Sequence, residues 1–269
     1  MKKNPIGFIT RKAEREVPAP IHRSEVQPKK SVVRIYFPHR GTGWAYYNDS
    51  FDLKVGDFVY VEGKLEGYRG QVTEVNHSFK IKLSDYKRVV AVADTNVTGD
   101  FYLAGTHIVS FDRNAIPYSK VLTWFKAPEN GEDFVCCNDG SSRFPLDDLS
   151  KMKISPDTAD RGHDYYVENR IVYAELDGTR GHAIAEGSKY YEIEFDFRSG
   201  EISNLKCSCF CSGACKHEFA VMLQLRETLD LIAENYDDKY SGYFAAVSKD
   251  SFVNTVMSKR TSGRISLEK

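Results

Sequence analysis

A cluster of cysteines near residue 210 constrains this chain more than any other feature of its sequence. Residues 206–217 read KCSCFCSGACKH, so four of the six cysteines of the 269-residue chain fall within nine positions. Zn²⁺ is held in proteins by four thiolate or imidazole ligands at tetrahedral corners. Cys207 and Cys209 can supply two thiolates from a strand end, and Cys215 and His217 can supply the rest from the first turn of a helix. We therefore predict one zinc ion held by these four side chains.

A site made entirely of protein ligands leaves no position for water, so we predict a structural zinc rather than a catalytic one. The positive end of a helix beginning at Cys215 favours the thiolate form, and Lys206 and Lys216 offset the charge of three thiolates. Cys211 lies only four residues before Cys215, and Cys209-x-Cys211 is an alternative ligand pair. Buried or redox-active thiols without metal are the competing interpretation.

The rest of the sequence divides into segments of different composition, and together they predict an α+β chain. Residues 1–31 hold eight Lys/Arg against three Glu and four of the nine prolines, which indicates a disordered basic arm. Residues 32–126 contain short runs rich in Val, Tyr and Phe separated by Gly turns, which is typical of a small β-barrel. Within this part we expect Phe79–Leu83 to form a strand, because polar and apolar residues alternate there.

The second half of the chain is predicted to begin with a polar connector, residues 127–157, which includes Cys136 and Cys137. Ser155-Pro156 is typical of a helix start, and four strands between residues 171 and 206 follow, joined by Asp-Gly, Glu-Gly and Ser-Gly turns. A helix from Cys215 to about Asn235 completes a predicted zinc-finger domain, residues 158–235. Residues 236–269 are expected to hold a short helix near 250–258 and a tail.

Two segments resemble known families. Residues 55–75, VGDFVYVEGKLEGYRGQVTEV, resemble the SH3-like barrels of nucleic-acid-associated proteins through their Gly and Val placement. Residues 158–232 resemble the SWIM zinc finger, the Cys-x-Cys…Cys-x-His module of Swi/Snf-type helicases and MuDR-type transposases. That resemblance implies a ββα finger that contacts DNA or protein, with Cys207, Cys209, Cys215 and His217 as its zinc ligands. The gap between Cys209 and Cys215 is shorter than is usual in that family.

The first functional hypothesis is DNA binding by the finger, the basic arm and a mixture of cations and aromatics on the predicted barrel. The candidate contacts on the barrel are Arg34, Tyr36, Arg40, Trp44, Lys80 and Lys82. Stacking aromatics beside Lys or Arg suit single strands. The charge of the finger argues against it as the main source of DNA affinity, because phosphate contacts need a surplus of basic groups. Residues 160–226 hold eight basic and eleven acidic groups, and Glu192, Glu194 and Asp196 lie along one strand.

The alternative hypothesis is a protein–protein adaptor in which zinc only stabilises the fold, with a Swi/Snf-type ATPase as one conceivable partner. The chain carries no Walker loop, Gly-x-Ser-x-Gly or His-Glu-x-x-His motif, so we expect neither an enzyme nor a small-molecule substrate. The formal charge is −1, and the longest apolar runs are far shorter than the roughly 20 residues of a membrane span. With no secretory signal at residues 1–12, we expect a cytoplasmic protein without membrane association.

Overall fold

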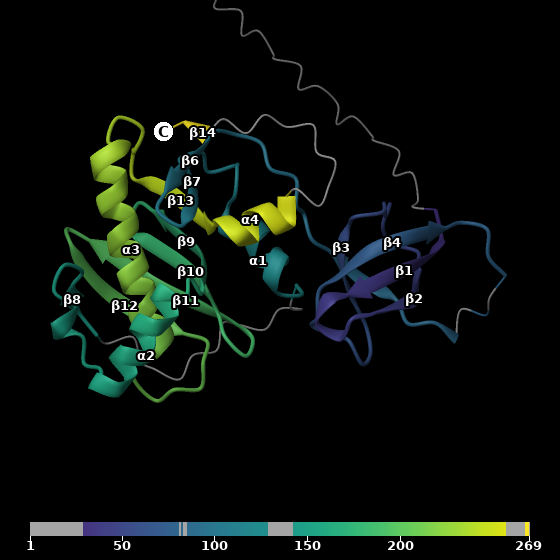
Figure 1. Ribbon diagram of the computed structural model, residues 1–269, viewed down its shortest axis with the longest axis horizontal. Helices are drawn as coiled ribbons and strands as arrows, with labels where there is room; N and C mark the ends of the chain where they lie inside the picture. Colours follow the sequence, from purple (N-terminus) through teal and green to yellow (C-terminus); the bar gives the residue numbers. More distant parts are fainter. Residues whose placement is uncertain (1–28, 81, 83–84, 129–141, 257–266, 269) are drawn as a thin grey trace, which may run out of the picture.

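The computed structural model describes residues 29–80, 82, 85–128, 142–256 and 267–268. Nearly all of the predicted basic arm, together with Cys136 and Cys137, lies outside the described residues. The described part is a mixed α+β structure built on two sheets, which form the cores of two neighbouring lobes (Figure 1). None of the helices in the described ranges is long and apolar enough to cross a membrane.

The first lobe is a five-stranded antiparallel sheet in the order β2-β1-β4-β3-β5. Its strands are β1 (Ser31–Phe37), β2 (Thr42–Asn48), β3 (Phe58–Val61), β4 (Gly70–Asn76) and β5 (Val89–Val92). Strict alternation along β1 buries Val33, Ile35 and Phe37 on one face, where they form the centre of a small core. Gly70 is required beside this core because a Cβ there would lie 2.4 Å from the Ile35 side chain.

The predicted small barrel is not closed in the described residues of this lobe. The edge strands β2 and β5 approach each other, but they are joined by a single bridge between Tyr47 and Arg88 rather than by a ladder. The expected strand Phe79–Leu83 is not formed at its described residues, because Phe79, Lys80 and Lys82 have no strand structure; Ile81 and Leu83 lie outside the described residues.

The second lobe is a nine-stranded sheet in the order β14-β6-β7-β13-β9-β10-β11-β12-β8, antiparallel except for the β14–β6 pair. Its strands are β6 (Phe101–Ala104), β7 (His107–Ser110), β8 (Phe144–Pro145), β9 (Ile171–Asp177), β10 (Arg180–Glu186), β11 (Tyr190–Arg198), β12 (Glu201–Cys207), β13 (Tyr243–Ser248) and β14 (Leu267–Glu268). The predicted hairpins β9–β10, β10–β11 and β11–β12 are confirmed, including the Asp177-Gly178 turn, where Gly178 has a φ of 61°.

Helices cover both faces of the nine-stranded sheet (Figure 1). On one face lie α2 (Pro156–Val167) and α3 (Lys216–Asn235), which pack on the apolar side chains of β9 to β12. On the other lie α1 (Tyr118–Phe125) and α4 (Lys249–Val256), which share a core with Tyr173 and Ile184. Ser155 caps α2 as predicted, since its side chain accepts a hydrogen bond from the Thr158 backbone amide.

Three parts of the predicted organisation differ from the structure. Strands β6 and β7 and helix α1, which we assigned to the 32–126 barrel, belong to the nine-stranded sheet and its helices. The described end of the 127–157 connector is packed rather than loose, because Phe144 and Leu149 are buried in the core and β8 pairs with β12. The 236–269 tail contains β13, a wholly buried strand in the middle of the sheet.

A half-buried arginine joins the two lobes. Arg69, just before β4, donates hydrogen bonds to the Trp124 carbonyl oxygen of α1 at 2.5 Å and to the Thr255 hydroxyl of α4 at 3.4 Å. Its guanidinium also lies 4.4 Å from the centre of the Phe58 ring. Burial lowers the pKa of Arg69 but leaves it a cation at any ordinary pH. One side chain of the first lobe thus contacts two helices of the second.

Candidate metal centre

The first two cysteines of the cluster come from the end of a strand. Cys207 is the last residue of β12 and pairs with Ile193 of β11, so its side chain enters the core under α3. The Ser208 amide donates to the Glu192 carbonyl oxygen at 2.9 Å, which extends the pairing by one residue and fixes the turn that carries Cys209. Strand pairing therefore positions two thiols two residues apart, as the Cys-x-Cys spacing predicts.

The other two side chains come from the start of α3. Cys215 is the N-cap, and its sulfur accepts a hydrogen bond from the Glu218 amide at 3.4 Å. The Glu218 carboxylate in turn accepts from the Cys215 amide at 2.8 Å, which completes a capping box with a thiol in the place of the usual hydroxyl. His217 follows within the first turn of the helix. The helix start thus holds one thiol and one imidazole on the side that faces β12.

All four side chains converge on one buried point. One ligand atom from each of Cys207, Cys209, Cys215 and His217 lies within 4.8 Å of the others, and each residue is 6% exposed or less. The His217 Nδ1 atom lies 3.8 Å from the sulfurs of both Cys207 and Cys215. A tetrahedral zinc with ordinary Zn–S and Zn–N bonds separates sulfur from nitrogen by about 3.6 Å. The four donors could therefore hold one metal ion, with Nδ1 as the imidazole ligand.

The protonation of the thiols shows why a cation suits this point. Hydrogen bonds from the neighbouring thiols lower the pKa of Cys209 well below the usual thiol range. The same contacts raise the pKa of Cys207 and of Cys215, because three thiolates cannot be crowded together without a balancing charge. A bound metal cation supplies that charge, and all three sulfurs can then be thiolates.

Two tyrosines hold the histidine ring in place. The ring of Tyr191 stacks on the His217 imidazole with centroids 4.2 Å apart, and Tyr165 of α2 meets it edge-on at 5.3 Å. The His217 Nε2 atom is buried and has no hydrogen-bond partner within the described ranges. Stacking, rather than a hydrogen bond to the second nitrogen, therefore sets the orientation of this ring.

Cys211 does not belong to this group. It is exposed, and it is absent from the four side chains that converge, although it is only two residues from Cys209. The geometry thus places Cys207, rather than Cys211, beside Cys209, Cys215 and His217. The alternative Cys209-x-Cys211 pair would need the 208–214 turn to rearrange.

A patch of aromatic and basic side chains surrounds the cluster, and the sequence did not reveal it. We call it the finger patch, and its members are Tyr165, Lys189, Tyr191, Phe210 and Lys216. The Lys189 ammonium lies 5.5 Å from the centre of the Phe210 ring and 5.6 Å from that of Tyr191, and Lys216 lies 4.2 Å from that of Tyr165. Phe210 is 82% exposed, the most exposed large apolar side chain described. The patch comes from three separate segments, so no local motif marks it.

The predicted DNA contacts of the first lobe do not form one surface. Arg34 and Tyr36 are exposed on β1, and their neighbours across β2 are Ala45 and Gly43. Trp44 is 57% exposed but pairs with the buried Ile35, which places it on the opposite face of the sheet. Arg40 ends the short 3₁₀ turn after β1. The sequence analysis did not name Tyr68, an exposed aromatic residue near Arg40. Tyr68 is 47% exposed, and its ring stacks on that of His39 with centroids 4.2 Å apart.

The predicted acidic row of β11 lies on the other side of the sheet from the finger patch. Glu192 accepts a hydrogen bond from the Tyr118 hydroxyl at 2.5 Å and forms an ion pair with Lys126, both from the α1 region. Burial, followed by the bond to Glu192, raises the pKa of Tyr118 far above its usual range. Glu192 therefore fastens α1 to the sheet, and its charge is partnered away from the cysteine cluster.

Comparison with known proteins adds no relative to this description. No family model matches the chain, and neither a curated protein nor a solved structure matches it. The metal centre therefore stands on its own geometry: three thiols and one imidazole, buried and within reach of a single ion.

Proposed function

We propose that this chain is a zinc-dependent, non-catalytic binding protein whose finger resembles the SWIM type and whose finger patch takes single-stranded nucleic acid. The observation that carries the proposal is the position of Phe210. Phe210 follows Cys209 directly, which places it beside the cysteine cluster. The residue is 82% exposed, and the Lys189 ammonium lies 5.5 Å from the centre of its ring. An exposed aromatic ring beside a cation is the arrangement on which unpaired bases stack.

Zinc is the metal that this donor set favours. Three thiolates and one imidazole are soft or borderline ligands, and a four-coordinate site with no open position is typical of structural zinc. The order of elements also supports a SWIM-type finger, since α2 precedes the strands, Cys207 ends a hairpin, and Cys215 begins α3. An SH3-like fold for the first lobe remains a prediction, because its sheet is open.

The electrostatic objection to nucleic-acid binding is weaker than the charge count suggested. The acidic surplus of residues 160–226 includes Glu175 and Glu192, which are occupied on the α1 face by hydrogen bonds from Tyr173 and Tyr118. On the finger side, Lys189 and Lys216 have aromatic neighbours. Phosphate contacts can therefore come from the finger patch as well as from the basic segment 1–31.

Fluorescence anisotropy with labelled single-stranded and double-stranded DNA tests the proposal, using the full, zinc-loaded chain across a salt series. Phe210→Ala should raise the Kd for single strands by about five- to 150-fold, the loss expected for one stacked base. Lys189→Ala should weaken binding and reduce the salt slope by about one. Val167→Ala is the control, because it removes an exposed apolar side chain that is not part of the finger patch. Val167 is 65% exposed on α2, and its replacement should leave the Kd unchanged.

A protein partner is the second candidate, and the exposed ring of Phe210 also favours it, because exposed aromatics are frequent anchors of protein interfaces. A zinc-loaded chain that binds no DNA at low salt would reject the nucleic-acid proposal and leave the adaptor function. The Swi/Snf-type ATPase is then the partner to try first, on the strength of the SWIM resemblance alone.

A further inference from the structure

A groove runs along the outer side of α3, away from the metal centre. Its larger part has a volume of about 450 Å³ and lies between α3, the β11–β12 turn and the segment after β8. A second hollow of about 400 Å³ lies between α3 and α2 and shares Arg226 and Asp230 with the first. We call the two together the α3 groove.

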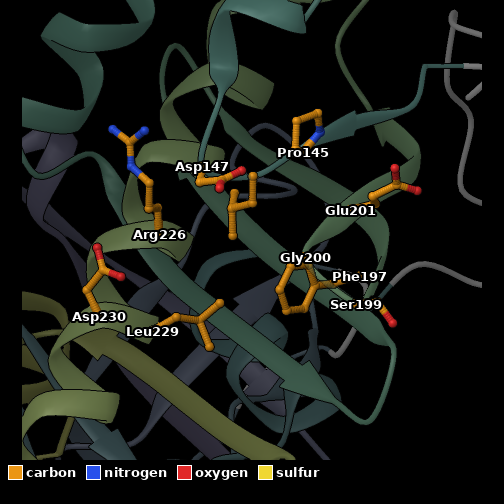
Figure 2. Close-up of a pocket in the computed structure, with 10 residues that line it drawn as sticks. Pro145, Asp147, Phe197, Ser199, Gly200, Glu201, Arg226, Leu229 and Asp230 are labelled. Carbon is orange, nitrogen blue, oxygen red and sulfur yellow. The ribbon is translucent and has the colours of Figure 1, made fainter.

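The floor of the α3 groove is apolar. Figure 2 shows the side chains of Phe197 and Leu229 facing the hollow from β11 and α3. In the second hollow Leu223 and Leu231 continue the same helix face. These four side chains are only partly buried and pack on the rim of the main core, so they leave apolar surface that an occupant can cover.

The rim of the groove is strongly acidic. Arg226 is the single Lys or Arg among the residues that line the two hollows. Against it stand five carboxylates, those of Asp147, Glu201, Glu227, Asp230 and Glu234. In Figure 2, Glu201 lies across the larger hollow from Arg226 and Asp230, and Asp147 lies on the Arg226 side. An occupant that fits must therefore carry apolar side chains between positive charges.

One segment of this chain has that composition. Residues 2–12, KKNPIGFITRK, place Ile6, Phe8 and Ile9 between two pairs of cations and contain no acidic residue. The other stretches outside the described residues fit less well. Residues 129–141 are acidic, and residues 257–266 are tied at both ends by α4 and by the pairing of β14 with β6.

We propose that residues 2–12 dock in the α3 groove of the same chain, with Phe8 and Ile9 on its apolar floor and the flanking cations at its acidic rim. The tether allows this over a long distance, since the sixteen residues 13–28 can span roughly 50 Å when extended. The groove then serves as an internal receptor for the basic segment, on a surface separate from the finger patch.

Photocrosslinking of the full chain tests the proposal directly. Phe8 is replaced by p-benzoylphenylalanine, the zinc-loaded protein is irradiated at low concentration, and the crosslinked peptides are identified by mass spectrometry. The expected product is a monomer crosslinked to residues 197–201 or 223–234. Crosslinks to the five-stranded sheet, or a product of dimer size, would overturn docking within one chain.

Exchanging the charges of the groove and of the N-terminal segment tests whether the crosslink reports a specific site or a chance contact. Asp230→Lys with Glu234→Lys, both at exposed positions of α3, should lower the crosslink yield about fivefold, as expected for the loss of two exposed ion pairs. Lys2→Glu with Lys3→Glu in that same protein should restore the yield. Equal yields in all three proteins would overturn the proposal, and circular dichroism of each confirms that the fold is retained.

Discussion

The ring of Tyr191 lies nearly parallel to the imidazole of His217, with centroids 4.2 Å apart and planes at 21°. The two residues come from β11 and from the first turn of α3, so their contact joins the hairpin to the helix at the metal centre. Outer groups that orient a metal-bound histidine usually do so by hydrogen bonding. Here the aromatic face of Tyr191 orients the His217 ring by stacking.

We therefore expect Tyr191→Ala to weaken zinc binding by about 10- to 100-fold, the loss typical when an outer partner of a metal ligand is removed. The measurement is a competition titration against a chromophoric zinc chelator. Tyr191→Phe is the matched control, because it keeps the ring and loses only the hydroxyl contact with Ser188 at 2.9 Å. Equal zinc affinity in the alanine variant would show that the stack does not orient His217.

The exposure of Cys211 and the burial of Cys215 predict opposite outcomes for two serine substitutions. Cys215→Ser removes a ligand and weakens the N-cap of α3, so zinc stoichiometry should fall from one to near zero and the region around residues 205–232 should unfold. Cys211→Ser should keep full stoichiometry and thermal stability. Elemental analysis of the purified proteins decides this, and full zinc in the Cys215 variant would refute the ligand assignment.

Gly162 allows α2 to cross the start of α3 at close range. A Cβ at this position would lie 2.9 Å from the Lys216 carbonyl oxygen and 2.9 Å from the Phe219 side chain. Helix propensity alone favours alanine over glycine by about 1 kcal/mol. We nevertheless expect Gly162→Ala to lower the free energy of unfolding by about 1–3 kcal/mol, because a backbone atom must move. Urea denaturation measures this, and a stabilised variant would contradict the crossing geometry.

His107 predicts a loss of stability in weak acid. It is fully buried on β7, its Nε2 donates to the Ile171 carbonyl oxygen at 2.7 Å, and burial lowers its pKa to about 4. Between about pH 6.5 and pH 4 the unfolded chain binds a proton that the folded chain does not. The free energy of unfolding should therefore fall by about 3 kcal/mol as the pH is lowered through this window.

His107→Gln is the comparison for that measurement, because glutamine cannot titrate and keeps a donor for Ile171. Zinc release by acid affects both proteins alike, so the difference between their stability curves isolates the histidine. The curves should separate below pH 6.5, with the wild type losing stability more steeply. Parallel curves across pH 4 to 7 would contradict the prediction.

The elements that sequence reasoning found are those with local signals. Ser155, the Asp177-Gly178 turn and the helix start at Cys215 each carry a cap or turn residue, and the structure has those elements at these positions. The convergence of Cys207, Cys209, Cys215 and His217 also follows from local spacing, because one turn connects the strand end to the helix start.

The features that the sequence did not predict depend on contacts between residues that are far apart in the chain. The run YFAAVS of β13 is buried on both faces, so it lacks the alternation that marks a half-exposed strand. Phe79, Lys80 and Lys82 come from an alternating run, yet these described residues have no strand structure. The finger patch joins residues up to 51 positions apart, from Tyr165 to Lys216, and the contact appears only once the sheet has formed.

The central place of β13 has a consequence for the order in which the protein can form during its synthesis. Residues 243–248 are inserted between β7 and β9, and they are made after every other strand except β14. Until they leave the ribosome, the edges of β7 and β9 both lack their neighbour, and such edges invite pairing with other chains. A recombinant fragment ending at residue 235 would keep that exposed edge permanently, so the finger is best produced together with the strand that follows it.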